Sequence, residues 1–385
     1  MERAMMKHYS LVSILFLVIF FCTSVTYPYK SRPDLGYADI DAYYSIATTH
    51  DKGEFYELTG TYAVHQLERW PVHLMLGGVA SVLNVDIWSI YRLTVLLCII
   101  VAMVAIGSFK CAENNRIAYL AFTIFNPYSF RLYYAFPGMI SDCLLYTAIV
   151  VFSLGIHSRN MVLISASTIV AIAARQTGIL LIPTLVVLAY YRKISWRNSL
   201  LVVMVGAVLF ATIKIVTLKL FRPVPDVMLT SYTLGVVHWL TSSPAWSNSS
   251  DFLAKLLFFG MTLSPVFLIK KNMSEVLVFL ACYAIFISQP IMAGPLVTGG
   301  NIQRLSAYGI PLLGLLMVRD DIKAENLLVF IVFSMLVSFH HHYSIMSLVD
   351  GGKFVFLVVV SLCAILSVLY FAWHAVMLPA LKRAV

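Results

Sequence analysis

Residues 88–108 read WSIYRLTVLLCIIVAMVAIGS, and Arg92 is the only charged residue among them. An α-helix needs about 20 mostly apolar residues to cross the ~30 Å hydrocarbon core of a bilayer, so this stretch is long enough to span a membrane. Similar apolar runs recur along the whole chain, separated by short polar segments. The pattern therefore predicts an all-α polytopic membrane protein.

The recurring runs predict about 12 transmembrane helices in a single transmembrane domain, residues 1–385. The composition agrees, because 60% hydrophobic and 12% charged residues lie outside the range of soluble globular proteins. The first run is interpreted as a retained span rather than a signal peptide. The predicted spans are 10–27, 88–108, 117–133, 138–157, 161–174, 177–191, 198–218, 253–269, 275–292, 305–318, 326–343 and 353–374.

The formal charge of +9 is spread between the predicted helices. No run of basic residues interleaved with aromatics is present, so nucleic acid is not an expected partner. With the N-terminus in the cytoplasm, the loops carry about +8 on the inner side and about +1 on the outer side. This follows the positive-inside rule and predicts a multi-pass protein of the bacterial inner membrane or the endoplasmic reticulum.

Two long outer loops are expected, at residues 28–87 and 219–252. In the first loop, residues 62–85 alternate polar anchors with apolar residues and predict helices that lie along the membrane interface. The second loop contains two tryptophans, Trp239 and Trp246.

The first outer loop carries Asp39 and Asp41 near its start, followed by Tyr43 and Tyr44. A carboxylate there can act as a general base or bind a divalent cation, Mg²⁺ or Mn²⁺. The competing interpretation is a solvated loop in which one Asp caps a helix. The short acidic pattern alone leaves both open.

Three arginines are expected near the outer ends of helices: Arg131, Arg175 and Arg304. Arginine binds phosphate through a planar fork of donors, so these residues could hold the phosphate of a membrane lipid. The alternative is that they extend to the lipid headgroups. Arg175 lies between two apolar runs with only a short Gln-Thr-Gly turn, which favours a functional role.

Histidines 340 to 342 are adjacent near the end of a predicted span. Consecutive helical residues point in different directions, so the three cannot easily bind one metal ion. Interface positions, or one substrate contact at His341, are expected instead, and no protein metal site is predicted.

Taken together, these features resemble the GT-C superfamily of membrane glycosyltransferases, which take sugars from polyprenyl-phosphate donors. The matching segments are Asp39-Ile-Asp41-Ala-Tyr43, the stretch GEFYELTGTYAVHQLERWP that leads into the interface helices, and the four stretches IYRLTVLL, FNPYSFRLYYAFPGMISD, ARQTG and NIQRLSAYGIPLL. The resemblance implies that Asp39, or Asp41 in exchanged roles, deprotonates an acceptor hydroxyl. It also implies that arginines hold the donor phosphate (Arg92, Arg131, Arg175 and Arg304) and that other side chains contact substrate (Tyr43, Tyr44, Asp142 and His341).

The acceptor implied by this resemblance is a glycan, a lipid or a protein. Two rival functions stay open: a polymerase or ligase of lipid-linked glycans, and a transporter or flippase. An acidic loop directly after the first span argues against the former. The lack of a clear internal repeat argues against the latter.

Overall fold

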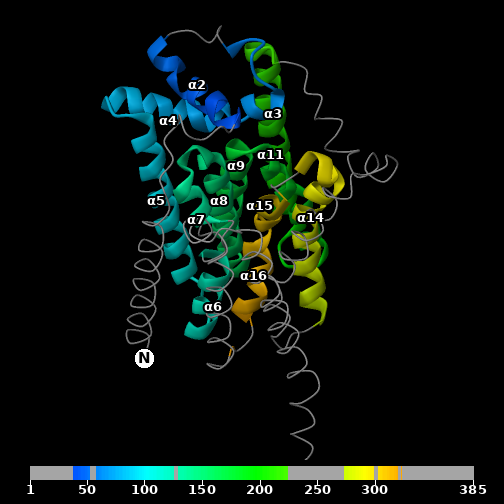
Figure 1. Ribbon diagram of the computed structural model, residues 1–385. Coiled ribbons are helices and arrows are strands. Elements are labelled where there is room, and N and C mark those ends of the chain that lie inside the picture. The colour runs from blue at the N-terminus through cyan, green and yellow to red at the C-terminus, as the bar shows by residue number, and fades with distance from the viewer. Residues whose placement is uncertain are drawn as a thin grey trace, which may run out of the picture.

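The computed structural model describes residues 38–52, 58–124, 129–223, 273–298, 302–319 and 322. Every element within these residues is a helix, and they contain no strand. The helices form a bundle with a layer of shorter helices across one end (Figure 1). The predicted all-α class is thus confirmed for the described part of the chain.

Four helical segments are long and apolar enough to cross a membrane. They match the predicted spans 88–108, 138–157, 198–218 and 275–292. The first is α5 (Ile87–Gly107), and the second, Pro137–Ser158, joins the short helix η3 (Pro137–Met139) to α8 (Ile140–Ser158). The third, Trp196–Phe221, joins α11 (Trp196–Val216) to η5 (Thr217–Phe221). The fourth, Ser274–Ala293, lies within α14 (Met273–Thr298).

Large apolar side chains cover the outer faces of α5 and α11. On a soluble monomer such continuous exposed apolar stripes are rare, but a helix that borders lipid needs them. These residues are Leu93, Leu97, Ile100, Val101 and Val104 on α5, and Leu200, Leu201, Met204, Val205 and Val208 on α11. Together with the four long helices, they indicate an integral membrane protein.

Other predicted spans correspond to helices that are shorter than a full membrane span. Helix α9, Met161–Ala174, has 14 residues; it rises about 21 Å, less than the ~30 Å hydrocarbon core. The stretches 177–191 and 305–318 are similarly divided into η4 (Gln176–Leu180) with α10 (Leu181–Tyr190), and α15 (Ile302–Ala307) with α16 (Ile310–Arg319).

The predicted span 117–133 is not one continuous described helix, since α6 covers Glu113–Ile124 and α7 covers Phe130–Ala135. The predicted spans 10–27, 253–269, 326–343 and 353–374 lie outside the described residues. The number of spans beyond four therefore stays a prediction.

The helices of the expected first outer loop are α2 (Ala38–Lys52), α3 (Val64–Leu67) and α4 (Trp70–Leu83). We call these three the cap helices, because they lie across one end of the bundle (Figure 1). The chain leaves α4 through Asn84, whose φ of 50° is left-handed. Asp86 then caps α5 by accepting hydrogen bonds from the backbone N–H groups of Trp88 and Ser89 at 3.0 and 3.3 Å.

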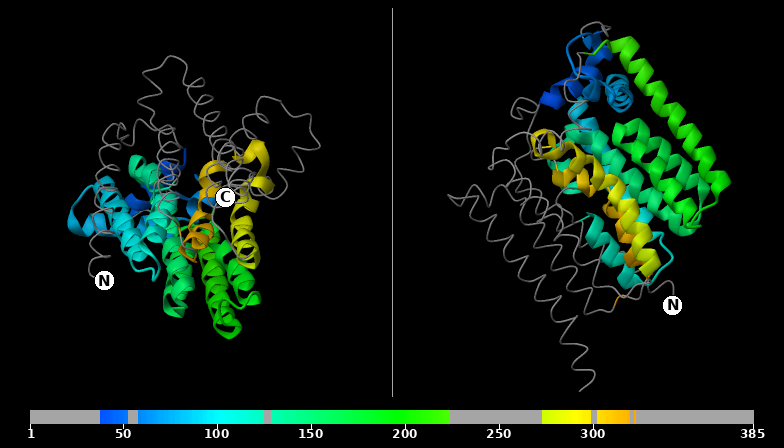
Figure 2. Two further views of the ribbon diagram at one scale, coloured as in Figure 1. Left: turned by 90° about the horizontal axis from the view of Figure 1, so that it is seen from below. Right: turned by 90° about the vertical axis from the view of Figure 1, so that its right-hand side faces the viewer.

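The end of α11 supports the cap helices from the side. Figure 2 shows α11 running alongside shorter helices of the bundle. Phe221 packs in an apolar cluster with Ile46, Leu58 and Leu67. Lys214 Nζ lies 2.5 Å from Glu68 Oε1, as an ion pair whose angles fall outside hydrogen-bond geometry. Residues 219–221 of the predicted second outer loop belong to this helical end, and 224–252 lie outside the described residues.

The close packing of α2 on α4 depends on Gly77. A Cβ atom at this position would overlap the backbone carbonyl of Ala47, which cannot rotate away. Gly77→Ala should therefore push the two helices apart and lower the free energy of unfolding by about 1–3 kcal/mol. The measurement is the thermal unfolding temperature of the purified protein in detergent.

The control is Gly206→Ala. Its added methyl would meet the flexible ends of Ile172 and Ile182 rather than backbone, so a much smaller shift is expected. Equal shifts for the two variants would contradict the proposed packing of α2 on α4.

Candidate functional site

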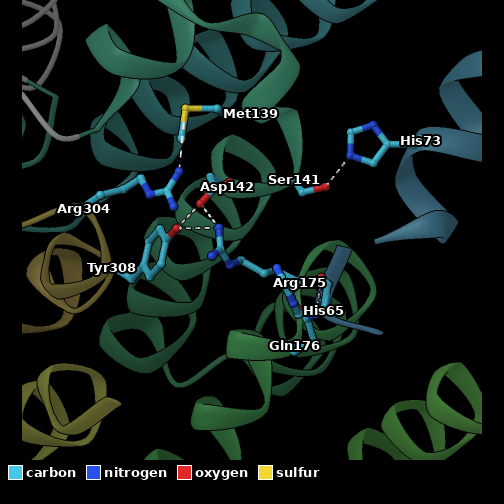
Figure 3. Close-up of polar contacts among 9 residues, drawn as sticks. All are labelled: His65, His73, Met139, Ser141, Asp142, Arg175, Gln176, Arg304 and Tyr308. Carbon is cyan, nitrogen blue, oxygen red and sulfur yellow. Dashed lines mark hydrogen bonds and ion pairs between the residues drawn. The ribbon is translucent and has the colours of Figure 1, made fainter. Parts of the chain in front are cut away.

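Asp142 lies in the first turn of α8 and is 1% exposed. Its Oδ1 atom accepts hydrogen bonds from Arg175 Nη1 and from the Tyr308 hydroxyl. Arg175 Nη1 also donates to the Tyr308 hydroxyl at 3.0 Å (Figure 3). A carboxylate so deeply buried requires such partners, because an unpaired buried charge is costly.

Arg175 reaches Asp142 because helix α9 stops at this residue. The backbone of Arg175 is extended, with φ −160° and ψ 146°, and the chain then continues as η4. The Gly178 N–H donates to the Arg175 carbonyl at 2.8 Å and closes the turn. The predicted Gln-Thr-Gly turn is thus a helix break that directs a guanidinium into the bundle.

Two further arginines lie within electrostatic range of Asp142. Arg304, on α15, places Nη1 3.9 Å from Met139 Sδ, next to the start of α8 (Figure 3). Arg69 lies between α3 and α4 and is 4% exposed. We call Asp142, Arg175, Tyr308, Arg304 and Arg69 the arginine cluster.

Arg69 extends over the ring of Tyr43, with Cζ 4.9 Å from the ring centroid. Burial and the neighbouring charge of Arg175 lower its pKa to about 10, while the carboxylates of Asp142 and Asp39 act in the opposite direction. Arg69 therefore keeps its charge at neutral pH. Repulsion between guanidinium groups accounts for part of the pKa shift, so the arginines of the cluster are close enough to repel one another.

Asp39 lies in the first turn of α2, and its side chain is 38% exposed. Its Oδ1 atom accepts a hydrogen bond from Gln66 Nε2 at 2.8 Å and lies 3.9 Å from His65 Nε2. Partial burial raises its pKa, but the charge of Arg69 and the Gln66 hydrogen bond outweigh this, so the pKa falls below its ordinary value. The Asp39 carboxylate is therefore ionised at neutral pH.

A hydrogen bond joins this part of the cap to the break after α9, because Gln176 Nε2 donates to the His65 carbonyl at 2.6 Å. The charge of Arg175 also contributes to the lowered pKa of Asp39. Asp39 and the arginine cluster are thus neighbours, although they come from α2, α8, the break after α9 and α15.

His73, on α4, connects the cap to the spanning helices. Its Nδ1 atom lies 2.7 Å from the Tyr91 hydroxyl on α5. Its Nε2 atom lies 3.1 Å from Ser141 Oγ on α8, as Figure 3 shows. Tyr43 stacks on the imidazole with ring centroids 4.4 Å apart. Either hydroxyl can donate or accept, so a neutral imidazole satisfies both of its ring nitrogens here.

The structure brings together four of the residues singled out from the sequence: Asp39, Asp142, Arg175 and Arg304. Tyr43 is buried beside Arg69, whereas Tyr44 is half-buried and stacks on Trp88 at 6.2 Å. Of the other expected site residues, Asp41 and Arg92 are exposed, the side chain of Arg131 is not described, and His341 lies outside the described residues.

Sequence reasoning missed Arg69, Tyr308 and His73 as site residues. Tyr308 follows Arg304 by four positions, a spacing that places two side chains on one helical face and could have been noticed. Arg69 directly follows Glu68 in the sequence, and two adjacent residues of opposite charge are typical of an exposed loop. His73 interrupts an apolar stretch, and only its partners on α5 and α8 explain it.

The surroundings of Asp39 do not fit the Mg²⁺ or Mn²⁺ that the sequence left open. The positive charges acting on its carboxylate are those of Arg69 and Arg175, and positive charges oppose cation binding. Within the described ranges, no three His, Cys, Asp or Glu residues converge on one point.

The chain was compared with known protein families, with curated proteins and with solved structures, and none of the three comparisons gives a match.

The ion pair between Asp142 and Arg175 should dominate the stability of this region. Asp142→Asn and Arg175→Gln each leave the partner buried with an unbalanced charge, so each should cost about 3–5 kcal/mol. The double variant removes both charges and should cost clearly less than the sum. Chemical unfolding in detergent of the four proteins measures this coupling.

The matched control is the pair Lys193 and Glu275, which is 2.8 Å apart and more exposed. Its coupling energy should stay below about 1 kcal/mol. Additive effects of the Asp142 and Arg175 substitutions would show that the two side chains do not interact.

The buried position of His73 predicts a pH dependence of stability. Burial and the charge of Arg69 lower its pKa to about 3, against an ordinary value near 6.5. Between these values the unfolded chain binds a proton that the folded chain does not. Stability is therefore fully present above pH 6.5 and falls by up to about 1.4 kcal/mol per unit as the pH drops toward 3.

The measurement is the unfolding temperature in detergent between pH 7 and pH 5. The expected decrease should be smaller in His73→Gln, whose amide does not titrate, and should persist in the control His157→Gln. The same slope in wild type and His73→Gln would exclude His73 as its source.

Proposed function

We propose that this protein is a membrane glycosyltransferase that moves a sugar from a polyprenyl-phosphate donor to an acceptor hydroxyl. The reaction takes place on the periplasmic or lumenal face of a bacterial inner membrane or of the endoplasmic reticulum. The acceptor is a glycan, a lipid or a protein. A bundle of about 12 spans with a GT-C-like arrangement belongs to the same proposal.

The observation that carries the proposal is the proximity of Asp39 to the arginine cluster, where the cap helices meet the spanning bundle. An ionised, partly exposed carboxylate and a group of buried and half-buried guanidiniums are the two parts that sugar transfer from a phosphate requires. A purely structural ion-pair network would not need three arginines for two carboxylates.

In the proposed mechanism, Asp39 is the general base. As the acceptor oxygen bonds to the anomeric carbon, its proton becomes acidic and passes to the Asp39 carboxylate. Gln66 and the neighbouring charges hold this carboxylate ionised and oriented. Attack from the face opposite the phosphate gives inversion at the anomeric carbon.

The arginines stabilise the leaving group. When the bond between the anomeric carbon and the phosphate oxygen breaks, its electron pair stays on the polyprenyl phosphate, which gains one negative charge. Guanidinium groups fixed near that oxygen lower the energy of the charge as it develops. Arg175 and Arg304 carry this role, and Arg131 and Arg92 are assigned to the donor phosphate on sequence grounds.

Asp142 acts through Arg175 by holding its guanidinium in place. Its proposed role is thus to position a phosphate-binding residue, and any substrate contact would come through that residue. Tyr43, Tyr44 and His341 remain proposed substrate contacts.

The test is sugar transfer in membranes, measured with a panel of polyprenyl-phosphate sugars at matched expression. Asp39→Asn keeps the size of the side chain but removes the base, so kcat should fall by about 10²–10⁴-fold. Asp41→Asn should cost less, because Asp41 is exposed. Glu275→Gln removes a carboxylate outside the proposed site and should leave transfer unchanged.

Loss of transfer in Asp41→Asn with full activity in Asp39→Asn would exchange the two roles. If the wild type consumed no donor, the glycosyltransferase proposal would fail. A glycan polymerase or ligase, or a transporter, would then be the better interpretation.

A further inference from the structure

The arginine cluster contains buried polar atoms that no described residue satisfies. Native proteins leave few buried polar atoms unpaired, and each such atom needs an explanation. Here they come from all three arginines and from side chains next to them. They are Nε of Arg69, Arg175 and Arg304, Oδ2 of Asp142, the hydroxyl of Tyr133 and Oγ of Ser306.

The charges of the site are also unequal. Arg69, Arg175 and Arg304 carry three positive charges, and Asp39 and Asp142 carry two negative ones, so the named groups have a surplus of +1. Glu68 and Lys214 beside them cancel each other. Surplus positive charge in a buried site is expensive, and an anion would compensate it.

A single phosphate matches this surplus at both ends of the reaction. A polyprenyl-phosphate sugar has one negative charge, which brings the sum to zero. After transfer Asp39 holds the acceptor's proton and the phosphate has two negative charges, so the sum is again zero. A diphosphate would exceed the available positive charge in both states.

Arg69 is the arginine best suited to supply the added contact. Arg175 already uses Nη1 on Asp142 and Tyr308, whereas the Arg69 guanidinium stacks on Tyr43 and has no carboxylate in contact among the described residues. The Tyr43 ring supports one face of the guanidinium, and the buried Nε of Arg69 has no hydrogen-bond partner, so a phosphate oxygen could accept from it.

We infer that Arg69 is a ligand of the donor phosphate and that it completes a site for a single phosphate group. This inference rests on the proposed function and adds a residue from the cap to the arginines of the bundle. The cap helices then contribute to donor binding as well as the base, so the donor is held from both sides.

The experiment measures thermal stabilisation of the purified protein in detergent by polyprenyl phosphate. The other probes are polyprenyl diphosphate, inorganic phosphate and the uncharged polyprenol. We expect polyprenyl phosphate to stabilise the wild type most strongly. Arg69→Gln should weaken its binding at least 10-fold, and Arg69→Lys should restore only part of the affinity, because an ammonium lacks the planar fork.

The matched control is Arg197→Gln, since Arg197 is exposed at the start of α11. In the transfer assay, Arg69→Gln should raise KM and lower kcat, whereas a purely structural role would lower only the unfolding temperature without ligand. If Arg69→Gln does not fold, the comparison of Arg69→Lys with wild type decides the question.

The outcomes separate the inference from the proposed function. A wild type that no polyprenyl phosphate stabilises would contradict the proposed function. Stabilisation of the wild type that is unchanged in Arg69→Gln and Arg69→Lys would overturn the inference alone. Equal stabilisation by inorganic phosphate would contradict a lipid-linked donor, and stronger binding of the diphosphate would overturn the match to one phosphate.

Discussion

The structure depends on keeping one carboxylate, that of Asp142, ionised inside a helical bundle. Water cannot solvate it there, so Arg175 balances its charge, and both Arg175 and Tyr308 donate hydrogen bonds to it. The break of α9 serves this requirement, because Arg175 leaves the helix in an extended conformation and its guanidinium contacts Asp142. Tyr308 contacts the same carboxylate from the turn between α15 and α16.

A second constraint is the attachment of the cap. The cap helices are short and would be marginal alone, so tertiary contacts must hold them. His73 joins α4 to α5 and α8 by two hydrogen bonds, and Lys214 and Phe221 hold the segment before Arg69 against the end of α11. These attachments hold α2, α3 and α4, the helices that carry Asp39 and flank Arg69, against the bundle.

Much of the helical fold follows from the sequence, because an apolar run such as 88–108 must be a helix if it crosses lipid. Asp39, Arg175 and Arg304 could also be selected, since charges at helix ends in an apolar chain are costly. Arg69 could not, because its value comes from contacts with residues far away in the chain, and for Tyr308 the sequence offers only its spacing of four positions from Arg304. Asp41 and Arg92 match the same sequence patterns, but both side chains are exposed in the structure.

The proposed substrate is half lipid and half sugar. A polyprenyl chain would stay in the hydrocarbon layer, its phosphate would lie near the headgroups, and the acceptor hydroxyl would arrive from water. In the proposed reaction the base would come from the cap and two of the arginines from the bundle, so the reacting bond would lie where the two layers meet. Because Arg69 belongs to the cap, a shift of the cap relative to the bundle would disturb the proposed base and the proposed phosphate site together. The attachments through His73 and Lys214 would then be requirements of the proposed chemistry as well as of the fold.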